Sequence, residues 1–206
     1  MAGEGGTGPD GPITVFTSAA TPHAARTIPP RSRRPPPPAG RYGVPVTEPR
    51  PIAVFDLDGT LADTAHRQHF LEHSPRDWRG FFAAAPQDPP LSEGVALARE
   101  AAADCDLLYL TGRPERCRAD TEAWLRAHGL PEGPVLVRGD HDRRPAVRTK
   151  LEALRGLRAT RTVRMLVDDD PLVLAEAERA GFRAVAADWG RTSRELRAGQ
   201  EREGRT

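Results

Sequence analysis

The sequence predicts an α/β protein built on a three-layer, doubly wound parallel sheet, and two observations lead to this prediction. From residue 52 onward, short apolar runs alternate with longer amphipathic segments, which is the order of strands and crossover helices in βαβ units. The apolar runs are nearly continuous, which is typical of parallel strands buried on both faces. We therefore expect an open, Rossmann-like sheet with helices on both sides.

The expected elements follow in chain order, beginning with a strand at 52–57 (IAVFDL). Further strands are expected at 107–111, 135–138, 163–167 and 183–187, and helices at 91–104, 114–128, 146–158 and 171–180. Pro114 and Pro171 occupy expected first helical turns, where proline loses no hydrogen bond. Gly129 and Gly181 follow expected last turns, where a left-handed backbone is common.

Residues 62–90 separate the first two strands and do not read as a simple crossover. They are irregular and richer in His, Phe, Trp and Pro than the neighbouring segments. We expect a small helical, cap-like insertion after the first strand.

Both ends of the chain differ in composition from the middle. Residues 1–50 are rich in Pro, Gly and Arg, a composition typical of a disordered leader, and 191–206 read as a charged, solvated tail that is helical or frayed. One domain is therefore expected over 51–190. The leader carries a net +3 and the tail +2, so that residues 51–190 carry −4 within a chain of net charge +1. No global field marks a nucleic-acid or membrane binder, although the basic leader could hold nucleic acid weakly.

Cysteine content and hydropathy indicate the compartment. Cys105 and Cys117 are the two cysteines of the chain, and they form no disulfide framework. Mean hydropathy is −0.56, the N-terminus lacks a basic region before an apolar run, and no segment approaches a membrane span. The expectation is a cytoplasmic protein with free thiols and no membrane partner.

Acidic residues gather where two expected strands end. Asp56 and Asp58 stand two positions apart at the end of the first strand, and Asp168, Asp169 and Asp170 end the fourth. In an open parallel sheet, ligands bind at the carboxyl ends of the strands. A cluster of carboxylates there needs a cation, and an all-oxygen site favours Mg²⁺.

Other groups at the same edge suit phosphate chemistry. The second strand ends in Thr111, Gly112 and Arg113, and Lys150 is the single lysine among 30 basic residues. Hydroxyl, ammonium and guanidinium groups stabilise a phosphoryl group during transfer, while one carboxylate can attack phosphorus and a second can move a proton.

These residues, in the order VFDLDGTLAD, YLTGR, Lys150 and LVDDD, resemble the haloacid dehalogenase superfamily of phosphohydrolases. The resemblance implies Asp56 as nucleophile and Asp58 as general acid and base. It also implies Thr111 and Lys150 as ligands of phosphoryl oxygens. The implied Mg²⁺ ligands are Asp56, the backbone carbonyl of Asp58, Asp168 and Asp169.

Within the superfamily, the chain is most similar to the phosphatase domain of polynucleotide kinase. The similar features are Arg67 eleven residues after Asp56, the arginine of TGR, and HDRRP shortly before the lysine. They imply that Arg67, Gly112, Arg113 and Arg144 contact phosphate or the nucleotide backbone. Two positions depart from that pattern: Ala146 replaces an acidic residue before the lysine, and Asp170 replaces an arginine.

The resemblance implies a Mg²⁺-dependent phosphomonoesterase acting on a 3′ or other terminal phosphate of DNA or RNA. A small-metabolite or nucleotide phosphatase and an inactive phosphate-binding module remain alternatives. Kinase activity is excluded because Lys150 follows Val-Arg-Thr and no phosphate-binding loop of the form GK[ST] is present. The oligomeric state is not predicted.

Some residues have plainer interpretations. Asp170 can cap a helix that begins at Pro171. His66, His69 and His73 share a helical spacing but lack further ligands, so a polar face of the insertion is favoured over a second metal site. Cys117 is interpreted as a buried, inert thiol rather than a reactive one.

Overall fold

Five parallel strands form one sheet in the order β3-β2-β1-β4-β5. The computed structural model describes residues 49–190 and 196–199. The strands are β1 (Ile52–Phe55), β2 (Asp106–Pro114), β3 (Val135–Arg138), β4 (Val163–Asp168) and β5 (Ala184–Ala186). The strand order reverses between β1 and β4, which is the topological switch point of a doubly wound sheet. The predicted fold class is confirmed.

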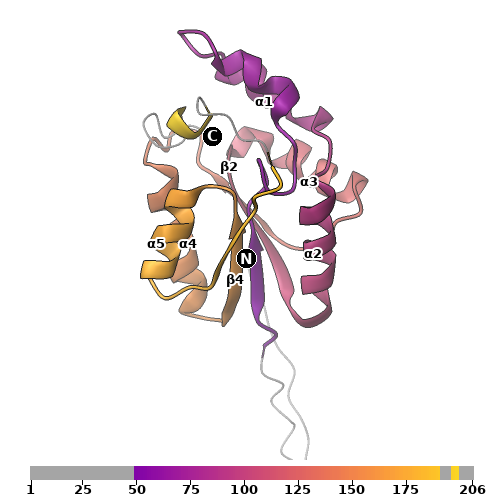
Figure 1. Ribbon diagram of the computed structural model, residues 1–206, viewed down its shortest axis with the longest axis vertical. Coiled ribbons are helices and arrows are strands. Elements are labelled where there is room, and N and C mark those ends of the chain that lie inside the picture. The colour runs from indigo at the N-terminus through magenta and orange to yellow at the C-terminus, as the bar shows by residue number, and fades with distance from the viewer. Residues whose placement is uncertain (1–48, 191–195, 200–206) are drawn as a thin grey trace, which may run out of the picture. The chain divides into compact units, whose positions relative to one another are not determined.

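Helices cover both faces of the sheet (Figure 1). They are α2 (Ser92–Asp104), α3 (Arg118–Ala127), α4 (Ala146–Arg158) and α5 (Pro171–Arg179). Apolar side chains of α2 and α3 cluster with Phe55 on one face, and those of α4 and α5 cluster with Val54 on the other. Neighbouring residues of a strand point to opposite faces, so β1 is buried on both sides.

The register of the central strands brings their carboxyl ends together. Phe55 lies beside Tyr109 of β2 and Val167 of β4. The backbone N–H of Asp56 donates to the carbonyl of Val167 at 2.9 Å, so Asp56 and Asp168 leave the sheet side by side. The two acidic motifs therefore meet at the switch point.

Element boundaries agree closely with the prediction except at Pro114. This residue ends β2 instead of opening a helix, because the strand continues beyond Thr111 to pair Pro114 with Arg138 of β3. A 3₁₀ turn η3 (Glu115–Cys117) follows, and α3 begins only at Arg118. Pro171 does lie in the first turn of α5, and Gly129 and Gly181 have positive φ of 62° and 80°.

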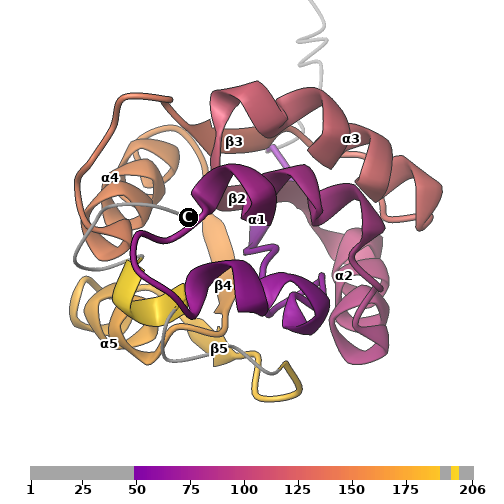
Figure 2. The same ribbon diagram turned by 90° about the horizontal axis from the view of Figure 1, so that it is seen from above.

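The predicted insertion is helical and lies over the carboxyl ends of the strands (Figure 2). It contains η1 (Ala65–Leu71), α1 (Trp78–Ala83) and η2 (Ala85–Gln87). Its apolar side chains form a separate small core with two residues from elsewhere, and the buried members are Leu71, Trp78, Phe81, Phe82, Cys117 and Leu196.

The C-terminal tail was expected to be solvated and helical or frayed, and its described part is helical but not fully solvated. Residues 196–199 are helical, and Leu196 is completely buried in the small core of the insertion. Gly199 lies against the Trp78 ring, since a β-carbon there would come within 2.4 Å of it. The predicted leader at 1–48 and the remainder of the predicted tail lie outside the described residues.

Replacing Leu196 with alanine should therefore destabilise the insertion. Removing a fully buried leucine side chain typically lowers the free energy of unfolding by about 2–5 kcal/mol. Leu172→Ala is the matched control, because Leu172 is 55% exposed and its loss should cost less than about 0.5 kcal/mol. Urea unfolding of both variants measures the difference, and equal midpoints would show that Leu196 does not support the fold.

Both cysteines are buried and free. Burial raises the pKa of the Cys117 thiol, which favours the inert interpretation. Within residues 49–190 and 196–199, no helix combines the length and the apolar character that a bilayer span requires.

Candidate active site at the carboxyl ends of β1, β2 and β4

The first group at the site is a lysine between two aspartates. Lys150 from α4 places Nζ 2.9 Å from Oδ1 of Asp56 and 2.7 Å from Oδ2 of Asp168. All three side chains are almost fully buried. Burial alone would lower the pKa of Lys150, but Asp168 and Asp56 outweigh it and raise that pKa, so the lysine stays charged.

Burial makes the ionised form of Asp56 unfavourable. Burial raises its pKa well above the usual value, and Asp168 and Asp169 add to this effect while Lys150 opposes it. Burial also raises the pKa of Asp168. A carboxylate that must be ionised in order to attack phosphorus therefore needs more positive charge than Lys150 supplies.

The donor set fits a hard divalent cation. Asp56, Asp168 and Asp169 are buried and offer carboxylate oxygens that lie within 4.8 Å of one another. Oxygen-only donors suit Mg²⁺, and a bound cation would offset the burial that raises the pKa values of Asp56 and Asp168. The side chain of Asp58 is not part of this group, which leaves its backbone carbonyl as the expected ligand.

The Asp58 carboxylate instead pairs with two buried arginines. Its Oδ1 accepts hydrogen bonds from Arg67 Nη2 at 2.8 Å and from Arg113 Nε and Nη2 at 2.9 and 2.5 Å. Burial raises the pKa of Asp58, but the two guanidinium groups outweigh burial and lower it to about 2. Asp58 Oδ2 is buried and has no hydrogen-bond partner among the described residues, so one oxygen is available for a proton.

Asp88 completes this network and was not predicted from the sequence. It follows η2 near the end of the insertion and is 1% exposed. Its carboxylate accepts from Arg67 Nε and Nη2, both at 2.7 Å, and from Arg113 Nη2 at 2.8 Å. His66 Nε2 lies 2.8 Å from the same carboxylate. Nothing in the sequence pairs Asp88 with these arginines, which lie 21 and 25 positions away from it.

The predicted phosphate ligands lie in different environments, because all but Arg144 are buried. Thr111 and Gly112 lie in the buried end of β2, and Arg113 follows them. Arg67 and Arg113 face carboxylates in a fully buried network, although an insertion arginine is usually exposed. Arg144 is 43% exposed and pairs with Asp142 and Glu152.

A cavity connects some of these groups. It has a volume of about 320 Å³, and its lining includes Thr111, Lys150 and Arg144. Apolar atoms of Leu136 and Val137 from β3 form another part of the wall. The cavity therefore joins the two predicted phosphoryl ligands to an apolar surface beside them.

Residues 50–190 match the family model described as the polynucleotide kinase PNKP phosphatase domain. The chain belongs to this family. The PNKP-type domain is accordingly a phosphatase of the haloacid dehalogenase type, as the motifs predicted. No match to this chain is found among curated protein sequences.

Solved structures support the fold of the PNKP-type domain. A chain of the Pnkp1/Rnl/Hen1 RNA repair complex aligns with a TM-score of 0.55 and 21% identity over 66% of this chain and 42% of that one. A class C acid phosphatase from Bacillus anthracis aligns with a TM-score of 0.52 and 14% identity over 75% of this chain and 78% of that one. A haloacid dehalogenase-like hydrolase from Streptococcus pneumoniae aligns with a TM-score of 0.52 and 16% identity over 73% of this chain and 90% of that one. This chain thus spans less than half of the RNA repair protein.

The departures of the PNKP-type domain from the sequence pattern have structural explanations. Asp170 caps α5, because its side chain accepts from the backbone N–H of Leu172 at 2.8 Å. Ala146 is buried at the start of α4, and Asp168 and Asp56 hold Lys150 without an acidic residue there. The capping interpretation of Asp170 is confirmed.

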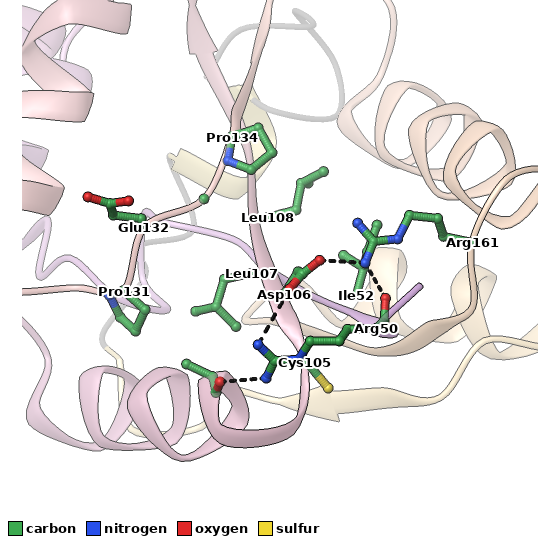
Figure 3. A pocket seen from close by; sticks show the side chains of 12 residues that line it. Arg50, Ile52, Cys105, Asp106, Leu107, Leu108, Pro131, Glu132, Pro134 and Arg161 are labelled. Atoms are coloured by element: carbon green, nitrogen blue, oxygen red, sulfur yellow. Dashed lines mark hydrogen bonds and ion pairs between the residues drawn. The ribbon is translucent and has the colours of Figure 1, made fainter. Parts of the chain in front are cut away.

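A second cavity in the PNKP-type domain lies at the opposite edge of the sheet. It has a volume of about 540 Å³ and is lined by the starts of β1 and β2. Figure 3 shows Arg50 and Arg161 pointing toward Asp106, and each forms an ion pair with it. Arg50, Arg161 and Asp106 neutralise one another's charge. They lie where β1 and β2 begin, whereas Asp56 follows the end of β1. We therefore assign no chemistry to this cavity.

Proposed function

We propose that the protein is a Mg²⁺-dependent phosphomonoesterase that forms a phospho-aspartate at Asp56 and removes the 3′ phosphate from DNA or RNA ends. The observation that carries the proposal is the pairing of Asp56 with Lys150 beside Asp58, whose Oδ2 has no partner among the described residues. One carboxylate is positioned to receive a phosphoryl group, and the other has an oxygen available for proton transfer.

Two displacements make up the reaction. An oxygen of Asp56 forms a bond to phosphorus as the bond between phosphorus and the 3′ oxygen breaks. Asp58 donates a proton to the leaving 3′ oxygen. Water then attacks the phosphorus of the phospho-aspartate and passes a proton to Asp58. Inorganic phosphate leaves and Asp56 is restored. Bound Mg²⁺ would supply positive charge that keeps Asp56 ionised and stabilises the transferring phosphoryl group.

The proposed mechanism needs Asp58 in a different protonation state in each step. A pKa of about 2 gives the ionised form that accepts a proton from water in the second step. For the first step, Asp58 must carry a proton. A phosphate dianion bound beside Asp58 adds negative charge there, which raises the pKa of Asp58.

The nucleic-acid substrate is supported by family membership and by the site. The matching family model is that of polynucleotide kinase phosphatase domains, and one structural neighbour belongs to an RNA repair complex. The cavity beside Lys150 offers apolar atoms of Leu136 and Val137 to a nucleoside. Arg144 lines the same cavity and would exchange its acidic partners for a backbone phosphate. Buried, free cysteines suit a reducing compartment, and we propose the cytoplasm.

The test is phosphate release by the full chain with Mg²⁺ or with EDTA. Substrates are matched oligonucleotides with a 3′ or a 5′ phosphate and a mononucleotide 3′-phosphate. We expect preference for the 3′-phosphorylated oligonucleotide and no release with EDTA. Asp56→Asn should reduce the rate by about 10³-fold or more, because it removes the nucleophile while keeping its shape.

Asp104→Asn is the control, since Asp104 is exposed at the far end of α2 and should not change the rate. Release from the mononucleotide alone would assign the protein to metabolite hydrolysis. No release from any substrate would favour a phosphate-binding module.

A further inference from the structure

The turn that follows Asp58 is enclosed by two glycines from distant parts of the chain. A β-carbon on Gly190 would lie 2.0 Å from the carbonyl oxygen of Gly59, and one on Gly94 would lie 2.1 Å from that of Thr60. Both distances are far below van der Waals contact. The backbone of α2 and the segment after β5 therefore touch the turn directly, and no larger residue fits at either position.

A tryptophan adds a directed contact to the same turn. Trp189 Nε1 donates to the carbonyl oxygen of Thr60 at 2.9 Å, across 129 positions in the chain. The indole ring packs against the core cluster on the α2 and α3 face. Gly94 also lies close to Trp189 Nε1, so donor and glycine meet at one oxygen. The name "turn clamp" is used below for Gly94, Trp189 and Gly190.

The turn clamp contacts the turn at the carbonyl groups of Gly59 and Thr60. Within the turn, Gly59 has φ of 86°, its N–H donates to the carbonyl of Ala62, and Thr60 N donates to Leu57 O. The residues after the turn are held by further backbone bonds, since Leu91 N donates to Leu61 O and Asp63 N donates to Pro89 O, both at 2.8 Å. The turn clamp adds contacts at Gly59 and Thr60 themselves. The side chain of Asp58 is fixed through Oδ1, and the turn clamp fixes the backbone that carries it.

We propose that Trp189 and Gly190 are positioning residues, which hold the Gly59–Thr60 turn so that Asp58 Oδ2 can protonate the leaving oxygen. This inference rests on the role given to Asp58 in the proposed function. A shift of about 1 Å in a reacting group can reduce a rate by about 10²-fold. The shift should matter only where the leaving group needs a proton.

Two substrates separate positioning from general packing. p-Nitrophenyl phosphate releases a weakly basic aryloxide that leaves without a proton, whereas a nucleoside 3′-phosphate releases an alkoxide that needs one. The value of kcat/KM reports formation of the phospho-aspartate in both cases. For Gly190→Ala we expect a loss of about 30–100-fold with the nucleotide and less than about 5-fold with the aryl ester.

Trp189→Phe is the milder variant, because it keeps a ring and removes the donor. It should show a selective loss of about 10-fold, and it carries the test if Gly190→Ala does not fold. Gly156→Ala is the control, since a β-carbon there meets open space and both rates should stay at the wild-type value.

Equal losses on the two substrates, or no loss on either, would overturn the positioning role. Failure of the proposed function looks different. In that case the wild type releases no phosphate from either ester, or Asp56→Asn is as active as the wild type.

Discussion

Replacing Lys150 with alanine is expected to lower the free energy of unfolding by about 3–5 kcal/mol in metal-free buffer, because it leaves buried carboxylates without their cation. Lys150 is 5% exposed and contacts Asp56 and Asp168 at 2.9 and 2.7 Å. Phosphate release should fall by about 10²–10³-fold, the usual cost of one lost donor to a transferring group. Chemical unfolding and initial rates measure the two effects.

The loss of stability in Lys150→Ala should depend on pH. Burial already raises the folded-state pKa of Asp56 and Asp168, and removing the lysine raises both further. A carboxyl group whose pKa is higher in the folded than in the unfolded state makes the fold less stable as pH rises from the unfolded pKa to the folded pKa, because the unfolded chain gives up its proton first. The variant should therefore lose more stability at pH 8 than at pH 5.

Magnesium provides an independent check on the same cluster. A divalent cation bound by Asp56, Asp168 and Asp169 neutralises the charge that Lys150 no longer balances, so added Mg²⁺ should narrow the difference from the wild type. Arg148→Ala is the control, since Arg148 is exposed on the same helix and should change stability by less than about 0.5 kcal/mol. If neither pH nor Mg²⁺ changes the difference in unfolding free energy between Lys150→Ala and the wild type, Lys150 does not neutralise the buried carboxylates.

The sequence was sufficient to predict the sheet and the acidic cluster, for a physical reason. Parallel strands expose their carboxyl ends at one edge, so residues that directly follow buried runs must meet there. Asp56 and Asp168 follow such runs, and Lys150 lies on the crossover between β3 and β4. Local capping chemistry was equally readable, as Asp170 before Pro171 illustrates.

Contacts that depend on tertiary packing were not predictable. Asp88 lies in an irregular segment, and only the folding of the insertion places it between Arg67 and Arg113. Leu196 belongs to a segment whose charged composition indicates solvent exposure, yet one apolar side chain reaches the core of the insertion. Trp189 follows the last strand with no pattern that relates it to Thr60. In each case the partner lies far away in the sequence.

The second large effect is expected for Asp88→Asn. The substitution keeps the size of the side chain but removes the charge that Arg67 and Arg113 share with Asp58. Two arginines that are 0% and 1% exposed then have one carboxylate between them. The free energy of unfolding should fall by about 3–5 kcal/mol. Rearranged guanidinium groups should lower kcat/KM by about 10²-fold. Asp140→Asn breaks an exposed pair with Arg116 and should cost less than about 1 kcal/mol.

A double-mutant cycle decides whether the Asp88 effect comes from unpaired charge. Arg67→Met alone removes a buried cation from Asp88 and Asp58, and Asp88→Asn alone leaves Arg67 underpaired. Combining them removes both members of the pair, so the double variant should be more stable than the sum of the single losses predicts. Additive losses would show that the two residues contribute only packing. Coupling would show that the Arg67–Asp88 ion pair, which forms within the insertion, contributes to stability as a pair.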